Sequence, residues 1–377
     1  MGSTRRLNAA VALSVAAICL AAHGDTHAAD WWEKVTVKGD FRYRHEMLDT
    51  DDSDARHRHR VRARLGVTGE VSEYTTVGVQ LASGSSDPVS TNQTLDDAFS
   101  TKSIGIDLAY IETTHPKLPG VTLTAGKMGN PFFKPGSSEL LWDSDLNPEG
   151  GALNWQRDID DVSVSLIGAG LWIDERSTGD DSWMGAAEGV ARFHFAEKKS
   201  SVAVGAGLYS YVNSKGFAPF YDDEDPYGNT QSSFVNGSDT TTGYSTEFEL
   251  VEAFIEFKHS LGTYPLTVMG DFVTNTAADS LSTGWLVGFA LGKTKAPGSW
   301  ELRYNYRRVE ADAVVGIFTD SDFREGGTDA RGHEFGGNLQ LARNTTFGVT
   351  YFVNEIGLEA QSPTDFTRLQ VDLQVKF

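Results

Sequence analysis

The chain has 377 residues with 52 acidic and 32 basic side chains, a formal net charge of −20. This acidic excess argues against nucleic acid as a partner, because a polyanion is bound by basic surfaces. The only cysteine, Cys19, lies close to the amino terminus. The rest of the chain can therefore supply neither a thiol nucleophile nor a cysteine metal ligand.

Residues 1–28 are predicted to be a signal peptide that is cleaved on export. Arg5 and Arg6 precede an apolar run over residues 7–22, and the small-residue sequence THA follows at positions 26–28. The run is shorter than the roughly 20 residues that a membrane-spanning helix needs. Residues 29–377 are expected to form a single domain, because no Pro-rich or Ser-rich linker interrupts them.

The segments at residues 35–44 and 56–71 alternate between apolar and polar positions with a period of two. This period predicts β-strands with one apolar and one polar face. After residue 29 no apolar stretch approaches the length of a spanning helix. An exported chain that is rich in such strands is therefore predicted to be all-β, a transmembrane antiparallel β-barrel.

The same reading of the whole chain predicts sixteen strands. An even number suits a closed bacterial barrel made from one chain. The predicted strands cover residues 34–47, 56–71, 74–83, 102–113, 120–128, 150–157, 161–173, 184–195, 201–212, 244–258, 264–275, 284–294, 299–310, 331–342, 345–355 and 365–377.

Long and short connections between these strands alternate along the chain. A barrel with short periplasmic turns and long outer loops is expected to sort its connections in this way. The long ones, at odd-numbered places, cover residues 84–101, 129–149, 213–243 and 311–330, and short ones at 115–119, 196–200, 296–298 and 344 fall between them.

The last predicted strand alternates up to the final residue, Phe377. A terminal aromatic residue is typical of outer-membrane barrels. Its resemblance to the signal that the barrel-insertion machinery reads implies this machinery as a partner, and the apolar strand faces imply outer-membrane lipid as another.

If the apolar faces meet lipid, the polar faces of the first two strands point basic side chains into the barrel. We call this set the arginine ladder. Basic side chains that line a pore favour anions. The alternative is a wall that acidic loops neutralise. The arginine ladder, the predicted pore lining, consists of Arg42, Arg44, Arg58, Arg60, Arg62 and Arg64.

The third outer connection reads NPFFKPGSSELLWDSDLNPEG over residues 130–150. It is too apolar for a solvated loop, so we expect it to fold into the barrel and set its carboxylates opposite the arginine ladder. An outward cap is the alternative. The residues expected at this constriction are Phe132, Phe133, Glu139, Trp142, Asp143, Asp145 and Glu149.

Other candidate sites carry weaker patterns. Acidic residues cluster at 222–225 and at Asp320, Asp322 and Asp329. They could bind calcium, but their spacing is not that of an EF-hand, so solvated loops are expected. His45, His57 and His59 could hold a metal only adventitiously. No HExxH, GxSxG or phosphate-loop pattern is present, and we expect no catalytic residue, no metal and no cofactor.

Several blocks together resemble a proteobacterial family of putative porins. This resemblance implies a sixteen-stranded barrel in the outer membrane of a Gram-negative bacterium. The blocks are FRYRHE (41–46), RHRHRVRARLGV (56–67), TNQTLDDAFS (91–100), GKMGNPFF (126–133), LWDSDLNPEGGAL (141–153) and WELRYNYRRVEADAVVGIFTDSDFREGGTDARGHEFG (300–336).

The third loop and the basic wall are also similar to those of trimeric diffusion porins, which implies a homotrimer. The expected function is passive diffusion of small hydrophilic solutes and ions, with the arginines favouring anions. The alternatives are a barrel that serves as a surface enzyme or adhesin, and a structural barrel without an open pore. A lumen enclosed by sixteen strands is wide enough for water unless something plugs it.

Overall fold

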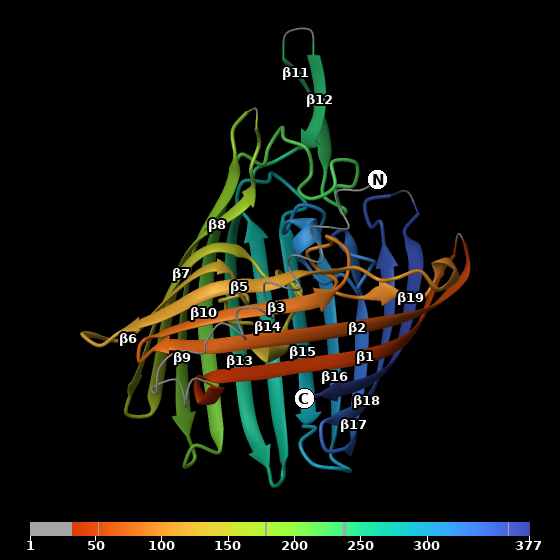
Figure 1. Cartoon of the computed structure of the whole chain (residues 1–377). Coiled ribbons are helices and arrows are strands. Elements are labelled where there is room, and N and C mark those ends of the chain that lie inside the picture. Colours follow the sequence, from red (N-terminus) through yellow and green to blue (C-terminus); the bar gives the residue numbers. More distant parts are fainter. Residues whose placement is uncertain (1–31, 52, 178, 237–238, 361) are drawn as a thin grey trace, which may run out of the picture.

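Sixteen antiparallel strands close into a barrel within the part of the chain that the structure, a computed structural model, describes (Figure 1). This part comprises residues 32–377 without 52, 178, 237–238 and 361. The predicted signal peptide lies outside it. No helix among the described residues is long and apolar enough to cross a membrane.

The barrel strands follow one another around the wall in chain order, each antiparallel to its neighbours. They are β1 (Val35–Thr50), β2 (Ser53–Ser72), β3 (Thr75–Ser83), β5 (Ile104–His115), β6 (Leu118–Lys127), β7 (Glu149–Ile159), β8 (Val162–Asp174), β9 (Ser182–Phe195), β10 (Ser200–Val212), β13 (Glu249–Leu261), β14 (Tyr264–Asn275), β15 (Thr283–Gly292), β16 (Trp300–Val309), β17 (Ala330–Ala342), β18 (Thr345–Ile356) and β19 (Thr364–Lys376).

Three short strands lie in the loops. β4 (Gln93–Thr94) pairs with β2, whereas β11 (Gln231–Asn236) and β12 (Asp239–Tyr244) form a separate hairpin. Figure 1 shows this hairpin projecting beyond the rim at the end of the barrel that carries the long loops. The sequence did not predict these strands, because short polar segments lack the alternation that an embedded strand shows.

The barrel closes where β1 meets β19 along eleven paired positions, from Asp40 with Lys376 to Thr50 with Phe366. At the end of this seam the main chains of Gly39 and Phe377 exchange two hydrogen bonds, of 2.9 and 3.0 Å. A closed sheet has no edge, so every strand satisfies its backbone hydrogen bonds within the wall.

The period of two sorts the side chains between the outside and the inside of the wall. On β1, Val37 and Phe41 are 55% and 45% exposed, although they are apolar. The alternating neighbours Asp40, Arg44 and Glu46 are buried. Apolar groups on the outside and charges within suit a wall that lipid surrounds, as the sequence predicted.

The largest differences from the predicted strand boundaries lie in the hairpin of β1 and β2 and in β13. The hairpin of β1 and β2 continues to Thr50 and Ser53, whose hydroxyl groups lie 2.8 Å apart, so only a tight turn remains of the expected link. β13 begins at Glu249 rather than at Tyr244. Tyr244 and Phe248 are fully buried among the loops, because their rings pack there instead of facing outward.

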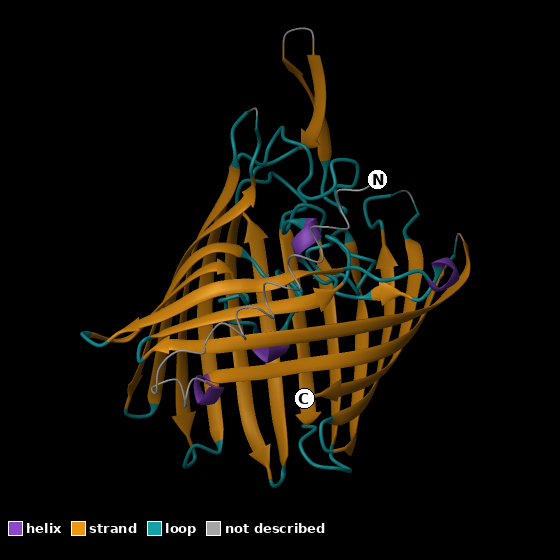
Figure 2. Ribbon diagram, viewed as in Figure 1, coloured by secondary structure: helices purple, strands orange, loops and turns teal. Residues whose placement is uncertain are grey.

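The long loops, among those drawn in teal in Figure 2, bury apolar side chains at one end of the barrel. We name the third loop (residues 128–148), the fifth loop (213–248) and the seventh loop (310–329) by their order at this end. Their buried side chains and those of the adjoining strands form one cluster, the loop core. The loop core includes Leu140, Trp142, Tyr209, Phe220, Tyr244, Phe248, Val314, Val315 and Ile317.

The seam predicts a steric requirement at Gly39. A Cβ atom there would lie 2.5 Å from the Arg64 carbonyl oxygen and 2.5 Å from the ring of Phe377. Gly39→Val should therefore destabilise the barrel by about 1–3 kcal/mol, as overpacking does. Thermal unfolding, followed by the loss of heat-modifiable gel mobility, measures this effect.

Gly69→Val on β2 is the matched control for this prediction, because a Cβ atom at Gly69 meets nothing within 4 Å. Equal unfolding temperatures for the two variants would contradict the described packing of the seam.

Candidate functional site

The third loop is tied to the barrel wall by carboxylates. The backbone amide groups of Phe133 and Gly136 donate hydrogen bonds to Glu188 (2.9 Å) and Glu256 (2.7 Å). The Ser138 hydroxyl donates to Asp271 at 2.7 Å. The accepting side chains, on β9, β13 and β14, are buried. Hydrogen bonds to charged acceptors are stronger than neutral ones, so these contacts hold the backbone of the loop in place.

Aromatic side chains also hold the third loop against this part of the wall. The Phe132 ring lies 5.5 Å from that of Trp142 and 5.0 Å from that of Tyr209 on β10. Phe133 stacks on Phe254 of β13 at 5.3 Å. Such ring pairs add about 0.5–1.5 kcal/mol beyond the apolar area that they bury. The apolar residues that made the loop unusual in the sequence thus contact the wall.

A cavity of about 260 Å³ separates the third loop from the opposite wall, and we call it the central cavity. Gly136, Ser137 and Glu139 line it from the loop. The opposite side carries charges of both signs: Arg42, Arg44, Arg303 and Arg307, and Asp320, Asp322, Glu334 and Asp372.

Each member of the arginine ladder lies within 4 Å of a carboxylate. Three of the six carboxylates belong to the strands and three to the loops, so wall and loops together neutralise the ladder. The ion pairs are Arg42 with Asp372 (3.9 Å), Arg44 with Asp372 (2.8 Å) and Asp322 (3.2 Å), Arg58 with Glu46 and Glu325 (3.7 Å), Arg60 with Glu46 (3.7 Å), Arg62 with Asp40 (3.0 Å) and Asp145 (3.4 Å), and Arg64 with Asp40 (2.7 Å) and Asp145 (3.4 Å).

The structure brings some predicted constriction residues together and leaves others apart. Asp145 reaches Arg62 and Arg64, whereas Asp143 is buried and accepts the backbone amide hydrogens of Asp145 and Ser321 at 2.7 and 2.8 Å. Asp143 therefore organises the third and seventh loops.

Glu149 is placed apart from this group. It is the first residue of β7, and its side chain is 60% exposed and pairs with Lys127 at 3.0 Å. It does not line the central cavity.

Two further arginines belong to the site, although the ladder did not include them. Arg307 on β16 pairs with Asp320 (2.6 Å) and Glu334 (2.7 Å). Arg368 on β19 pairs with Asp322 (2.8 Å) and also contacts Glu46. Both lie on the polar faces of strands with a period of two, and this signal could have found them.

The seventh loop is packed and not solvated, which makes the expectation for its acidic residues wrong. Asp320 is buried, and Asp322 pairs with Arg44 and Arg368. The neighbouring apolar residues fix the loop inside the barrel through the loop core. The acidic run at 222–225 in the fifth loop is exposed, as predicted.

The protonation of the loop carboxylates follows from their surroundings. Burial, and next the charge of Asp320, raise the pKa of Glu139 to about 8. Burial and the neighbouring Glu139 raise the pKa of Asp143 as well. Burial would also raise the pKa of Asp322, but Arg368 and Arg44 hold it well below its usual range. The loops thus place protonated and ionised acids side by side.

The candidate metal site on the outer face shows ring contacts and one hydrogen bond. The His45 ring lies 5.7 Å from that of His57 and 4.9 Å from that of His59, and the Tyr43 hydroxyl lies 2.8 Å from His59 Nδ1. Among the described residues no group of three or more His, Cys, Asp or Glu could hold a metal ion.

The central cavity is one of three that share lining residues. A cavity of about 180 Å³ next to Arg58, Arg60 and Arg368 shares Asp322 with it. A cavity of about 710 Å³ at the end with the short turns, which we call the inner vestibule, shares Arg303 and residues of the third loop with it. The three cavities follow one another along the barrel interior.

The family model described as putative porin matches residues 47–219 and 221–377. The chain belongs to this putative porin family. The match begins within β1 and covers the other barrel strands as well as the third and seventh loops. No curated protein matches the chain significantly.

Solved porin structures share the fold of this family member. OprB of Pseudomonas putida has a TM-score of 0.59 at 9% identity, covering 93% of this chain and 96% of that one. OmpF of Salmonella typhi, in complex with daunomycin, has a TM-score of 0.56 at 11% identity, covering 91% and 97%. At this identity the likeness establishes the barrel architecture alone.

The raised pKa of Glu139 predicts how the docking of the third loop depends on pH. Glu139 has a pKa of about 8 in the docked loop, against 4.5 for an ordinary glutamate. Between these values the docked state keeps a proton that the undocked state has released, so stability falls as pH rises from about 5 to about 8. The temperature of unfolding, measured across this range, should fall less steeply for Glu139→Gln.

Glu149→Gln is the matched control for this test, because it removes an exposed carboxyl at the end of the same loop. Identical pH profiles for Glu139→Gln and the unaltered protein would contradict the buried, protonated state of Glu139.

Proposed function

We propose that this protein is a porin in the outer membrane of a Gram-negative bacterium, through which small hydrophilic solutes and ions diffuse passively. The central cavity carries the proposal, because most of the side chains that line it are charged or polar, whereas apolar side chains fill the neighbouring loop core. A polar lining can replace part of the hydration shell of a passing solute.

In this proposal the third loop folds inward and sets the size limit of the pore. Its hydrogen bonds to Glu188, Glu256 and Asp271 support an inward position, because these side chains come from the inner face of the wall. The Asp145 carboxylate of the loop and the arginines of the ladder would create an electric field across the constriction. Such a field orients dipolar solutes and slows apolar ones.

The arginine ladder would favour anions through those arginines whose positive charge is least balanced by carboxylates. Arg42 and Arg60 have the longest ion pairs of the ladder, at 3.9 and 3.7 Å. Their Nε atoms are buried without a hydrogen-bond partner within the described part of the chain. These two guanidinium groups retain the most unbalanced charge of the ladder and can attract a passing anion.

The proposal extends to processing and assembly. Removal of residues 1–28 would leave residues 29–377 as one barrel domain. The exposed ring of Phe377 at the end of β19 would be read by the barrel-insertion machinery, and the outer apolar faces would contact lipid. The resemblance to trimeric diffusion porins favours a homotrimer. The chemistry proposed for the pore is not enzymatic and uses no cofactor.

Single-channel recording in a planar bilayer under a KCl gradient tests the pore directly. We expect stable open steps from the purified, folded protein, because the cavities follow one another along the interior. Heat-denatured protein from the same preparation is the control. If folded and inserted protein gives no steps, the barrel is closed, and a surface enzyme or adhesin becomes the leading hypothesis.

The same recording tests the ladder. Arg42→Gln combined with Arg60→Gln should shift the reversal potential toward cations. The permeability ratio should change by about twofold or more, because a unit charge about 8 Å away in water contributes about 0.5 kcal/mol.

Arg308→Gln combined with Arg331→Gln provides the matched control for the ladder test. These arginines pair with Glu310 and Glu355 near the same end of the barrel and do not line the central cavity. An equal shift in both double variants would show that the ladder has no special influence on selectivity.

A further inference from the structure

The inner vestibule lies on the opposite side of the third loop from the loop core. Its walls come from the turn between β9 and β10, from β13 and β14, and from β15, β16 and the link that joins them. Phe133, Lys134, Gly136 and Ser137 of the third loop line it as well. With a volume of about 710 Å³ it has room for a small organic solute.

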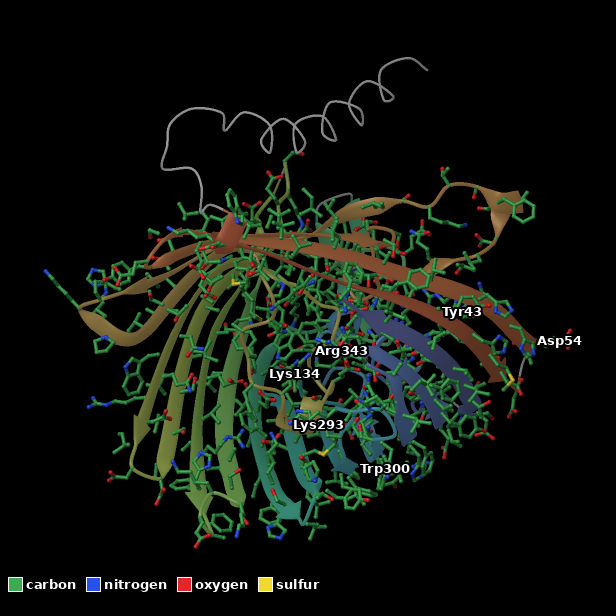
Figure 3. The ribbon with its side chains drawn as sticks, turned by 60° about the horizontal axis from the view of Figure 1, so that its bottom comes forward. Tyr43, Asp54, Lys134, Lys293, Trp300 and Arg343 are labelled. Carbon is green, nitrogen blue, oxygen red and sulfur yellow. The ribbon has the colours of Figure 1, made fainter. Side chains whose placement is uncertain are left out.

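Basic side chains dominate this vestibule in a chain that is otherwise acidic. Six basic residues and two acidic ones line it, whereas the whole chain has 32 basic and 52 acidic residues. Figure 3 turns this end of the barrel forward and labels Lys134 and Lys293 there. The six basic residues are Lys134, Lys198, Lys199, Lys258, Lys293 and Arg303.

The two carboxylates of the vestibule already have partners. Glu256 lies 2.8 Å from Lys258 and 2.9 Å from Arg192, and it also accepts the Gly136 amide hydrogen. Glu301 accepts a hydrogen bond from the Asn338 side chain at 3.4 Å. Two carboxylates can balance at most two of the six basic groups, so the vestibule keeps a net positive charge.

Most of the other basic groups have no carboxylate inside the vestibule. Lys198 and Lys293 have no ion pair within 4 Å in the described ranges, and Lys134 contacts only the Asp143 carbonyl oxygen at 3.4 Å. Lys199 pairs at 3.5 Å with Glu197, which does not line the vestibule.

The positive charge of Arg303 is also only partly balanced. It reaches Glu334 at 3.5 Å through one terminal nitrogen, and its Nε atom is buried without a partner among the described residues. The vestibule thus differs from the arginine ladder, where a carboxylate accompanies every guanidinium group.

We propose that the inner vestibule is a binding site for small anions that carry two or more negative charges. Several uncompensated ammonium groups around one cavity attract a multivalent anion more strongly than chloride, because each additional charge on the ion adds Coulomb energy. The proposal rests on the proposed porin function in one respect: an anion held here, at the inner end of the passage, obstructs the path of smaller ions.

Pyrophosphate is the probe for the site. Added to one chamber of a planar bilayer during KCl recordings, it should block the current, and more strongly from the side that faces the vestibule. Lys198→Gln combined with Lys293→Gln should raise the blocking concentration by about tenfold, a change of about 1.4 kcal/mol. Acetate, a monovalent anion, should block weakly in both proteins.

Lys117→Gln combined with Lys295→Gln is the matched control. Both lysines are exposed in short turns at the same end of the barrel, and neither lines the vestibule. Block that persists in the control and weakens in the vestibule variant supports the site. Absence of block, or equal weakening in both variants, overturns it, since surface charge alone would then account for the effect.

A second measurement separates this proposal from the porin function. Isothermal titration of the full-length protein in detergent with pyrophosphate measures binding without any current. If the protein does not conduct but binds pyrophosphate, and the binding requires Lys198 and Lys293, the porin function fails and the site stands. If it conducts but shows no such binding, the site fails and the porin function stands.

Discussion

Closure of the sheet between β1 and β19 is the constraint on which the other features of this protein depend. A strand with a free edge would leave amide and carbonyl groups unpaired, and in lipid each unpaired group costs several kcal/mol. The backbone pairing of Gly39 with Phe377, next to the end of the last strand, completes the ring. Once the ring is closed, one face of each strand can be apolar throughout and the other can carry charge.

In its proposed inward position, the third loop divides the interior of the closed wall into two unlike parts. On one side the apolar residues of the third, fifth and seventh loops pack into the loop core. On the other side ion pairs line the central cavity. The division follows from the loop sequence, because its aromatic residues pack against the wall while Glu139 remains beside the cavity. Burial of the aromatic residues thereby fixes the position of the Glu139 carboxyl group beside the cavity.

The strands could be predicted from the sequence because lipid outside and water inside impose a period of two at every position of the wall. Elements that escape this rule were missed, among them the projecting hairpin of β11 and β12 and the start of β13. Hydrogen bonding and packing within the loops, rather than the two solvents, determine these elements.

The site was predictable to a smaller extent. Alternation placed the ladder arginines on the polar face, but their partners depend on contacts between distant segments. Glu46 and Arg368 are 322 positions apart in the chain and touch only because the barrel closes. The register that joins two such strands cannot be read from either of them alone. The apolar content of the third loop marked it as unusual, whereas the similar content of the seventh loop was overlooked.

Asp322 links the interior of the barrel to the order of its assembly. Its carboxylate contacts Arg44 on the first strand and Arg368 on the last. Before closure these two guanidinium groups lie at opposite ends of an open sheet. Asp322 of the seventh loop therefore cannot contact both of them until the barrel has closed. The two edges also attract each other directly, because Arg44 pairs with Asp372 and Arg368 contacts Glu46 across the seam. Asp322 adds a third carboxylate between these arginines, so the loop that shapes the interior also helps to fasten the wall around it.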